Sequence, residues 1–186
     1  MSKLSPTLSI YETTFAPSYK SDAILVVEGK KLHVNKALLS YHSDYFNTLF
    51  NSEFKEKSQE KIEIKDVNFE DFAVLLSLIH KNPIEITKPR IEKLLVLADQ
   101  FLLTAPKLLI EQFISSAACF NRFEKLKLAD KYKLDFVFER ALKEYNSRGA
   151  FGDFQYNNST FTQFSNETKI KICEKFFGGY AYGLEQ

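Results

Sequence analysis

The strongest constraint on the fold is a strand pair that runs directly into a helix between residues 23 and 41. The apolar run "AILVV" at 23–27 predicts a strand buried on both faces, and the alternation of "KLHV" at 31–34 predicts its partner. The Glu-Gly-Lys sequence at 28–30 predicts the tight turn between them. Asn35 is a good N-cap residue, so the chain is expected to enter a helix as soon as the hairpin ends.

Strand and helix signals continue to residue 89. Ser43 is expected to cap a second short helix, and "KIEIKDV" at 61–67 alternates as a strand. Asn68 then opens a helix whose apolar residues recur on one stripe. The segment "KNPIEITKP" at 81–89 predicts a turn with an optional short edge strand, because proline cannot donate to a sheet.

The remainder is helical and contains one internal repeat. "LADQFLL" at 97–103 returns 31 residues later as "LADKYKL" at 128–134, and each copy ends one helix and leads into the next. We expect two stacked helical hairpins, since two copies are too few for a self-supporting solenoid. Residues 146–161 are rich in Gly and Asn, which predicts a long loop before a last helix at 166–177 capped by Ser165.

Residues 1–20 are expected to form an arm. Pro6 and Pro17 interrupt this segment, while the alternation of Leu8 and Ile10 with polar residues permits a short strand. A disordered leader fits the same segment equally well.

Composition excludes several classes of function. Of 186 residues, 25 are Lys or Arg and 24 are Asp or Glu, so the net charge of +1 lacks the basic footprint of a nucleic-acid binder. No apolar stretch is long enough to span a bilayer, and the N-terminus lacks the apolar run of a signal peptide. Cys119 and Cys173 are expected to be buried thiols in a reducing compartment. We therefore expect a cytoplasmic or nuclear protein with no nucleic-acid or membrane partner.

Candidate chemistry gathers in one short stretch that carries Ser40, His42 and Asp44. A nucleophilic serine needs a base and an orienting group within hydrogen-bond reach, but the break at Ser43 places Asp44 at the start of the next helix. No glycine stands beside either serine to build an oxyanion hole. His33 and His42 lie on different elements, and no metal-ligand spacing or glycine-rich phosphate loop is present. We expect no catalytic residue, no metal and no cofactor.

Apolar surface is the remaining candidate for function. The helix at 36–41 offers apolar residues around most of its circumference, which is too wide for a short helix with one buried face. Either the helix lies wholly in the interior or one side of it meets another chain. Periodicity alone leaves both readings open.

The stretch from residue 21 to 118 resembles a BTB (POZ) domain, and its wording is closest to nematode members of that family. Asp22 before the first strand and Leu32-His33-Val34-x-Lys36 entering a helix carry the resemblance, and the remaining signature positions are Leu39, Ser43, Tyr45, Phe46, Phe50, Ile62, Ile64, Asp66, Val67, Phe69, Phe72, Leu75, Leu76 and Ile79. The resemblance implies an α+β fold in which a small β-sheet is flanked by helical hairpins. Asn35 and Asp44 depart from common family residues without removing a core position.

The resemblance also implies a homodimer. BTB domains dimerise through the helix that here begins at Lys36, often with an N-terminal strand exchanged between subunits, which gives Leu8 and Ile10 a role. Asp22 and Lys36 match the family's buried charged pair at that interface, an arrangement that favours specificity more than stability. The expected interface residues are therefore Leu8, Ile10, Asp22, Lys36, Leu38, Leu39 and Tyr41.

Many BTB proteins are substrate adaptors of cullin-3 ubiquitin ligases, and their contact motif is matched by Phe54-Lys55-Glu56. The resemblance implies an arm at 1–20, the BTB domain at 21–118, a three-box or BACK-like helical extension at 119–177 and a flexible tail at 178–186. No substrate-recruiting module is evident, and residues 1–20 leave no room for a MATH domain. We expect a non-catalytic adaptor of cullin-3 with an unknown substrate. The alternative is a BTB scaffold or corepressor-recruiting module that does not bind cullin.

Overall fold

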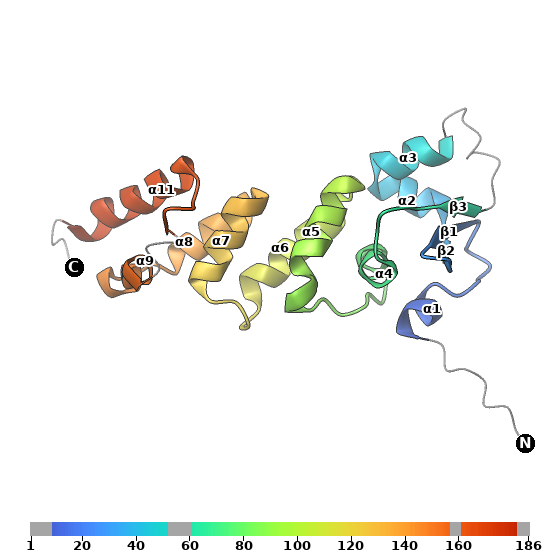
Figure 1. Cartoon of the computed structure of the whole chain (residues 1–186), viewed down its shortest axis with the longest axis horizontal. Helices are drawn as coiled ribbons and strands as arrows, with labels where there is room; N and C mark the ends of the chain where they lie inside the picture. Colours follow the sequence, from blue (N-terminus) through green and yellow to red (C-terminus); the bar gives the residue numbers. More distant parts are fainter. Residues whose placement is uncertain (1–8, 52–60, 157–160, 182–186) are drawn as a thin grey trace, which may run out of the picture. The chain divides into compact units, whose positions relative to one another are not determined.

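The computed structural model describes residues 9–51, 61–156 and 161–181, and the chain forms two compact units, Met1–Ile110 and Glu111–Gln186. The elements of the N-terminal unit are α1 (Ile10–Thr14), β1 (Ala23–Val27), β2 (Lys30–Val34), α2 (Lys36–His42), α3 (Asp44–Asn51), β3 (Lys61–Glu63), α4 (Phe69–Ser77), η2 (Lys88–Arg90), α5 (Ile91–Gln100) and the start of α6 (Thr104–Ser116) (Figure 1). The elements of the C-terminal unit are the end of α6, α7 (Arg122–Tyr132), α8 (Asp135–Lys143), η3 (Arg148–Phe151), α9 (Gly152–Tyr156), α11 (Asn166–Phe176) and η4 (Phe177–Ala181). The predicted α+β fold with a helical extension is confirmed.

The sheet has the strand order β2-β1-β3, with β1 antiparallel to β2 and parallel to β3. The predicted hairpin is confirmed, and its two central turn residues, Glu28 and Gly29, both have positive φ (48° and 75°), as a type I′ turn requires. The prediction that β1 is buried on both faces is wrong, because burial alternates along the strand. One face of this sheet packs on the core while the other is partly open.

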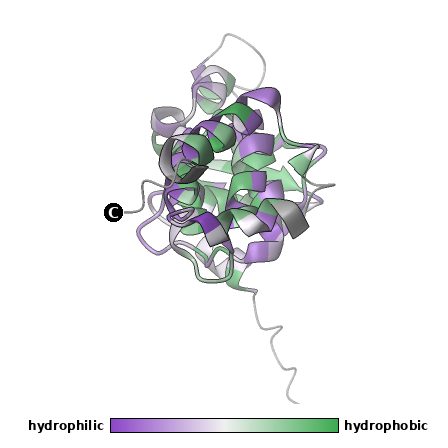
Figure 2. Ribbon diagram, turned by 90° about the vertical axis from the view of Figure 1, so that its left-hand side faces the viewer, coloured by the Kyte–Doolittle hydropathy of each residue, from purple (hydrophilic) through white to green (hydrophobic). Residues whose placement is uncertain are grey.

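Helix α4 is the centre of the N-terminal unit. All eight residues from Asp71 to Leu78 are buried, which is the pattern of a helix enclosed on every side. The Phe72 ring contacts the Phe101 ring at 4.9 Å, and Phe101 stacks on Phe46 at 5.8 Å, so rings from α3, α4 and the end of α5 meet. Aromatic side chains therefore pack these helices against one another. Figure 2 shows hydrophobic and hydrophilic segments alternating along the helices, as expected of helices with one buried side.

The arm is helical where the sequence permitted a strand. Helix α1 begins at Ile10 with a capping box, in which Ser9 accepts from the Glu12 N–H and the Glu12 carboxylate accepts from the Ser9 N–H. Helix α1 is followed by Phe15, which is buried, and the Phe15 carbonyl accepts from the His33 N–H of edge strand β2 at 3.1 Å. A strand through Ile10 is therefore wrong, whereas Leu8 lies outside the described residues.

Hydrogen bonds of Arg90 connect α1 to α4. Its guanidinium donates to the Asp71 and Glu70 carboxylates at 2.6 Å each and to the Tyr11 hydroxyl at 3.1 Å. These carboxylates raise the pKa of Arg90, and the hydrogen bond that Arg90 donates to Glu70 is the largest cause. The side chain of Asp71 is almost fully buried, so its charge depends on Arg90 and on Lys93, whose amine lies 3.4 Å from it.

The predicted edge strand at 81–89 is wrong, because none of these residues forms a strand and only η2 is regular. The Ile84 N–H instead donates to the buried Ser77 hydroxyl at 2.9 Å. A side-chain acceptor on α4 thus replaces the sheet ladder that a strand would need.

The internal repeat marks two equivalent helix ends. Leu102 after α5 and Lys133 after α7 adopt left-handed conformations, with φ of 50° and 53°. One residue later, the Leu103 N–H donates to Ala98 O at 2.8 Å and the Leu134 N–H donates to Ala129 O at 3.0 Å. Each is the long bond of a Schellman-type helix end, so the repeat encodes how the helix stops and the next one begins.

The loop predicted at 146–161 is partly wrong, since η3 and α9 form within it. The reason is aromatic burial: the rings of Phe151 and Phe154 lie 5.3 and 5.0 Å from the buried Tyr145 ring. Burial is the main cause that raises the pKa of the Tyr145 phenol. Ser165 caps α11 as predicted, its hydroxyl accepting from the Thr168 N–H at 3.2 Å.

The expectation of buried thiols is wrong, because Cys119 and Cys173 are both exposed. In the described parts of the chain, no helix is both long enough and apolar enough to cross a membrane.

Replacing Arg90 by Met is expected to lower the free energy of unfolding by about 2 kcal/mol, because it leaves the buried Asp71 carboxylate with one longer contact. Urea unfolding followed by circular dichroism measures the change. The matched control is Lys107→Met, since the Arg90 and Lys107 side chains are both 25% exposed but Lys107 pairs with the exposed Asp99. That control is expected to cost under about 1 kcal/mol. Equal losses in the two variants would contradict the role given to Asp71.

Candidate interaction surface

Helix α2 presents most of its surface to solvent. Of its seven residues, only Leu39 is buried, at 1% exposure, whereas Leu38 is half-buried and Tyr41 is 84% exposed. The helix is therefore not an interior helix, and the first of the two sequence readings fails. Leu39 is buried within its own unit. The surface of α2 that is available to another chain is therefore made by the residues next to Leu39 in this helix.

Hydrogen bonds at the N-terminal end hold α2 in place. The Asn35 side chain accepts from the Leu38 N–H at 2.8 Å and donates to Lys20 O at 2.7 Å. The Asp22 carboxylate accepts from the Lys36 N–H at 2.7 Å, as a negative charge at a helix N-terminus should. The Lys36 amine lies over the Phe50 ring, 5.8 Å from its centroid. The predicted Asp22–Lys36 pair is thus joined through the Lys36 backbone within one chain, and its burial in a dimer stays a prediction.

Ser43 joins this helix to the α5–α6 turn. Its hydroxyl donates to Phe101 O at 2.6 Å and accepts from the Phe46 N–H at 3.1 Å, and Ser43 forms an isolated β-bridge with Leu103. The predicted capping role of Ser43 is confirmed. The bridge brings the start of α3 beside the left-handed Leu102, which is 54% exposed.

The residues considered for a hydrolase triad are not assembled as one. Ser40 lies within α2, Ser43 follows that helix with a buried hydroxyl, and Asp44 lies exposed in the first turn of α3. The His42 ring packs edge-on against Tyr41 at 5.0 Å. Across the described ranges, no group of three His, Cys, Asp or Glu residues is placed to hold a metal ion.

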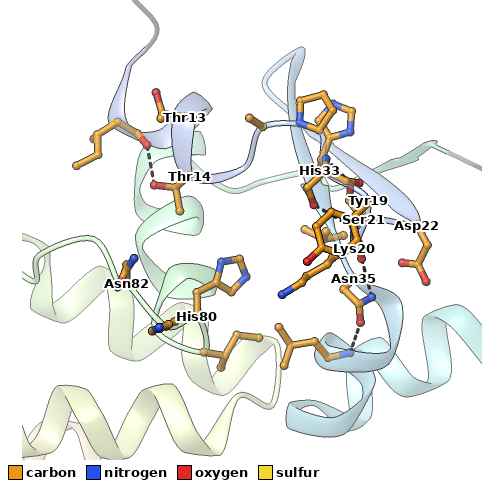
Figure 3. A pocket seen from close by; sticks show the side chains of 18 residues that line it. Thr13, Thr14, Tyr19, Lys20, Ser21, Asp22, His33, Asn35, His80 and Asn82 are labelled. Carbon is orange, nitrogen blue, oxygen red and sulfur yellow. Dashed lines mark hydrogen bonds between the residues drawn. The ribbon is translucent and has the colours of Figure 1, made fainter.

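A groove of about 1150 Å³ opens beside α2 within the N-terminal unit (Figure 3). Three segments far apart in the sequence form its walls, namely residues 10–22, 33–38 and 79–82. Ile10, Asp22 and Leu38, which the sequence assigned to one interface, all line it. The structure therefore brings three of the predicted interface residues to one place.

His80 lies in one wall of the groove. This histidine is half-buried, its ring lies 5.0 Å from that of Phe15, and burial lowers its pKa below the ordinary value. Sequence reasoning missed His80, Lys20 and Lys81 as groove residues. No local pattern marks them, because only the return of the arm onto α4 brings the three segments together.

The N-terminal unit is thus a small α+β domain that carries a partly exposed helix and an adjoining groove. The BTB/POZ domain family matches residues 11–118, and the chain belongs to this family. BTB domains are protein-interaction modules. The predicted cullin-binding residues Phe54, Lys55 and Glu56 lie outside the described residues, as does Leu8, so these assignments stay predictions.

Relatives of the chain agree with this assignment. A BTB/POZ domain-containing protein of Caenorhabditis elegans is 33% identical over 160 residues, which are 86% of this chain and 50% of that protein. BTB and MATH domain-containing protein 36 of the same nematode is 36% identical over 128 residues, 67% of this chain and 39% of that protein. Kelch-like protein 15 of Gallus gallus is 25% identical over 136 residues, 68% of this chain and 28% of that protein. The chain spans half or less of the length of each of these relatives.

Among solved structures, the BTB domain of human gigaxonin is similar to this chain, with 26% sequence identity and a TM-score of 0.45. The similarity covers 60% of this chain and 99% of the gigaxonin chain.

Lowering the pH is expected to destabilise the N-terminal unit through His80. Because its pKa is lowered on folding, the unfolded chain binds the proton more readily, so stability is full above the ordinary histidine pKa of 6.5 and is lost as the pH falls below it. Urea unfolding at about pH 7.5 and about pH 5.5 measures this loss. The variant His80→Gln is expected to lose less stability over the same interval, and an unchanged pH dependence would contradict the assignment.

Proposed function

We propose that this BTB protein forms a homodimer through α2 and serves as a non-catalytic substrate adaptor of a cullin-3 ubiquitin ligase in the cytoplasm or nucleus. The observation that carries the proposal is the exposed face of α2, where Tyr41 is 84% exposed beside the half-buried Leu38. A large ring and an aliphatic side chain on a rigid helix form the kind of anchor that protein interfaces use.

The proposed dimer uses helix against helix, without exchange of a strand through Ile10. Residues 10–15 already pack on their own unit, where Phe15 is buried and Tyr11 bonds with Arg90. Ile10 is 59% exposed, so it remains available at the margin of the interface. Leu39 supports the helix from beneath, and Asp22 and Lys36 fix its first turn.

The proposed cullin surface lies where the start of α3 meets the α5–α6 turn. Tyr45 packs edge-on against Phe101 at 5.0 Å and stays partly exposed. The exposed Leu102 follows Phe101 in the chain, and the Phe101 carbonyl accepts the hydrogen bond from Ser43. The motif Phe54-Lys55-Glu56 follows α3 in the sequence. Kelch-like relatives and the resemblance to cullin-3 adaptors support this reading. The alternative, a scaffold or corepressor-recruiting module, predicts the same dimer and no cullin binding.

The variant Tyr41→Glu is expected to weaken dimerisation at least about a hundredfold, because it places an unpaired charge in an apolar interface. Light scattering coupled to size exclusion, at micromolar concentration, reports the mass. The control is Val96→Glu, an equally drastic change at another exposed apolar residue, on α5. A monomeric wild-type protein, or loss of the dimer in both variants, would refute the α2 interface.

The variant Leu102→Asn is expected to leave stability unchanged or slightly higher, since asparagine tolerates the left-handed conformation better than leucine does. It is expected to weaken binding to a purified cullin-3 N-terminal domain by about tenfold, because apolar contact is lost. Pull-down and calorimetry measure the binding.

Two further variants test the sequence motif in the same assay. Phe54→Asp and Glu56→Lys are each expected to abolish the pull-down, whereas Tyr19→Glu, at a fully exposed position away from α3, is expected to keep it. Wild-type protein that fails to bind the cullin domain would favour the scaffold alternative. Binding that survives in all variants would remove the site while leaving the adaptor role.

A further inference from the structure

We propose that the homodimer through α2 is pH-sensitive and dissociates in mildly acidic solution, because protonated histidines then meet lysines in the groove at the margin of its interface. The inference rests on the dimer proposed above, whose expected interface residues Ile10, Asp22 and Leu38 also line the groove. A second copy that packs on α2 therefore covers part of the groove, and two-fold symmetry covers the same part in both copies.

Two of the three histidines in the chain line this groove. His33 comes from β2, and His80 comes from the segment that follows α4, so parts of the chain far apart in the sequence bring these side chains to one space (Figure 3). Both residues are half-buried in one chain. Histidine is the side chain whose charge normally changes between about pH 5 and pH 8, so mild acid adds positive charge to the groove of each copy.

The groove carries positive charge before any histidine is protonated. The other ionisable residues among its described lining residues are Tyr19, Lys20, Asp22 and Lys81. The Lys20 amine lies over the Tyr19 ring at 5.5 Å from the centroid and points toward His80 across the groove (Figure 3). Asp22 supplies the carboxylate of this set, and it already accepts from the Lys36 N–H. Protonation of a histidine here therefore increases an existing excess of positive charge.

Burial determines the direction of the effect. His80 contacts the uncharged Phe15 ring at 5.0 Å, and burial already lowers its pKa in one chain. A second copy buries the groove further and adds its own positive charges nearby, and both changes favour the neutral ring. The free chain therefore binds protons more readily than the dimer does. The dimer is fully favoured above the ordinary histidine pKa of 6.5 and is lost as the pH falls below it.

Analytical ultracentrifugation of the full chain at about pH 7.5 and about pH 5.5 tests the proposal, with circular dichroism at each pH to check the fold. The dissociation constant of the wild-type dimer is expected to rise about tenfold at the lower pH, which corresponds to a shift of about one pKa unit for one group. Salt at about 0.5 M is expected to recover part of the affinity lost at the lower pH, because it screens the repulsion.

The double variant His33→Gln with His80→Gln removes the groove histidines, and His42→Gln is the matched control. His42 is the third histidine of the chain. It does not line the groove, and it lies in the last turn of α2, where the helix dipole favours a positive charge. The readout is the ratio of the dissociation constants at the two pH values. This ratio is expected to fall close to unity in the double variant and to stay about tenfold in the control.

The outcomes separate this inference from the dimer on which it rests. A wild-type chain that is monomeric at the higher pH overturns the proposed dimer, and the inference with it. A wild-type dimer with the same dissociation constant at both pH values overturns the inference alone. So does loss of the helical signal together with the dimer, since the chain would then be unfolding. A pH dependence that persists in the double variant, that disappears in His42→Gln, or that salt leaves unchanged also overturns the role of the groove.

Discussion

A single hydroxyl group sets the geometry on which the proposed surfaces depend. Ser43 interrupts what would otherwise be one helix, and it is buried with both hydrogen-bonding roles in use. By donating to Phe101 O, it satisfies a carbonyl at the end of α5 that has no partner within its own helix. The same contact joins the break between α2 and α3 to the α5–α6 turn. An uninterrupted helix would have carried Tyr41 and Tyr45 on one face, whereas with the break Tyr45 packs against Phe101 and Tyr41 stays exposed.

Local sequence signals predicted the secondary structure wherever a side chain caps a backbone group. Asn35, Ser43, Asn68 and Ser165 were each expected to cap a helix, and each accepts the hydrogen bond that this role requires. Such bonds join residues three apart, so the sequence alone carries the information. The helix ends within the repeat were predicted for the same reason, because the hydrogen bonds that end a helix are local.

The errors share a different physical origin. The alternation of Leu8 and Ile10 suggested a strand, but the Ser9–Glu12 capping box and the contact with Arg90 favour α1. Arg90 lies far along the chain from Tyr11, and no pattern within the arm encodes it. The loop predicted after residue 146 failed likewise, because the rings of Phe151 and Phe154 gain their burial from Tyr145. Long-range packing overrode local composition in both places.

The predicted interface residues show how much of a candidate site the sequence can indicate. The family resemblance assigned Asp22, Lys36 and Tyr41 to this interface, while only the coordinates separate the buried Leu39 from its less buried neighbours. The groove was beyond sequence reasoning altogether, because its lysines come from segments that meet only after folding.

The way α2 is stabilised explains why its outer face can remain free. A short helix is marginal in water unless packing or capping supports it. Helix α2 fully buries one residue, Leu39, and the Asn35 cap and the Asp22 carboxylate at its first turn add to the stability that this packing gives. Hydrogen bonds at the end of a helix stabilise it without requiring particular side chains at its exposed positions. The outer face of α2, with the half-buried Leu38 and the exposed Tyr41, therefore remains available for the contact with a second polypeptide that we propose.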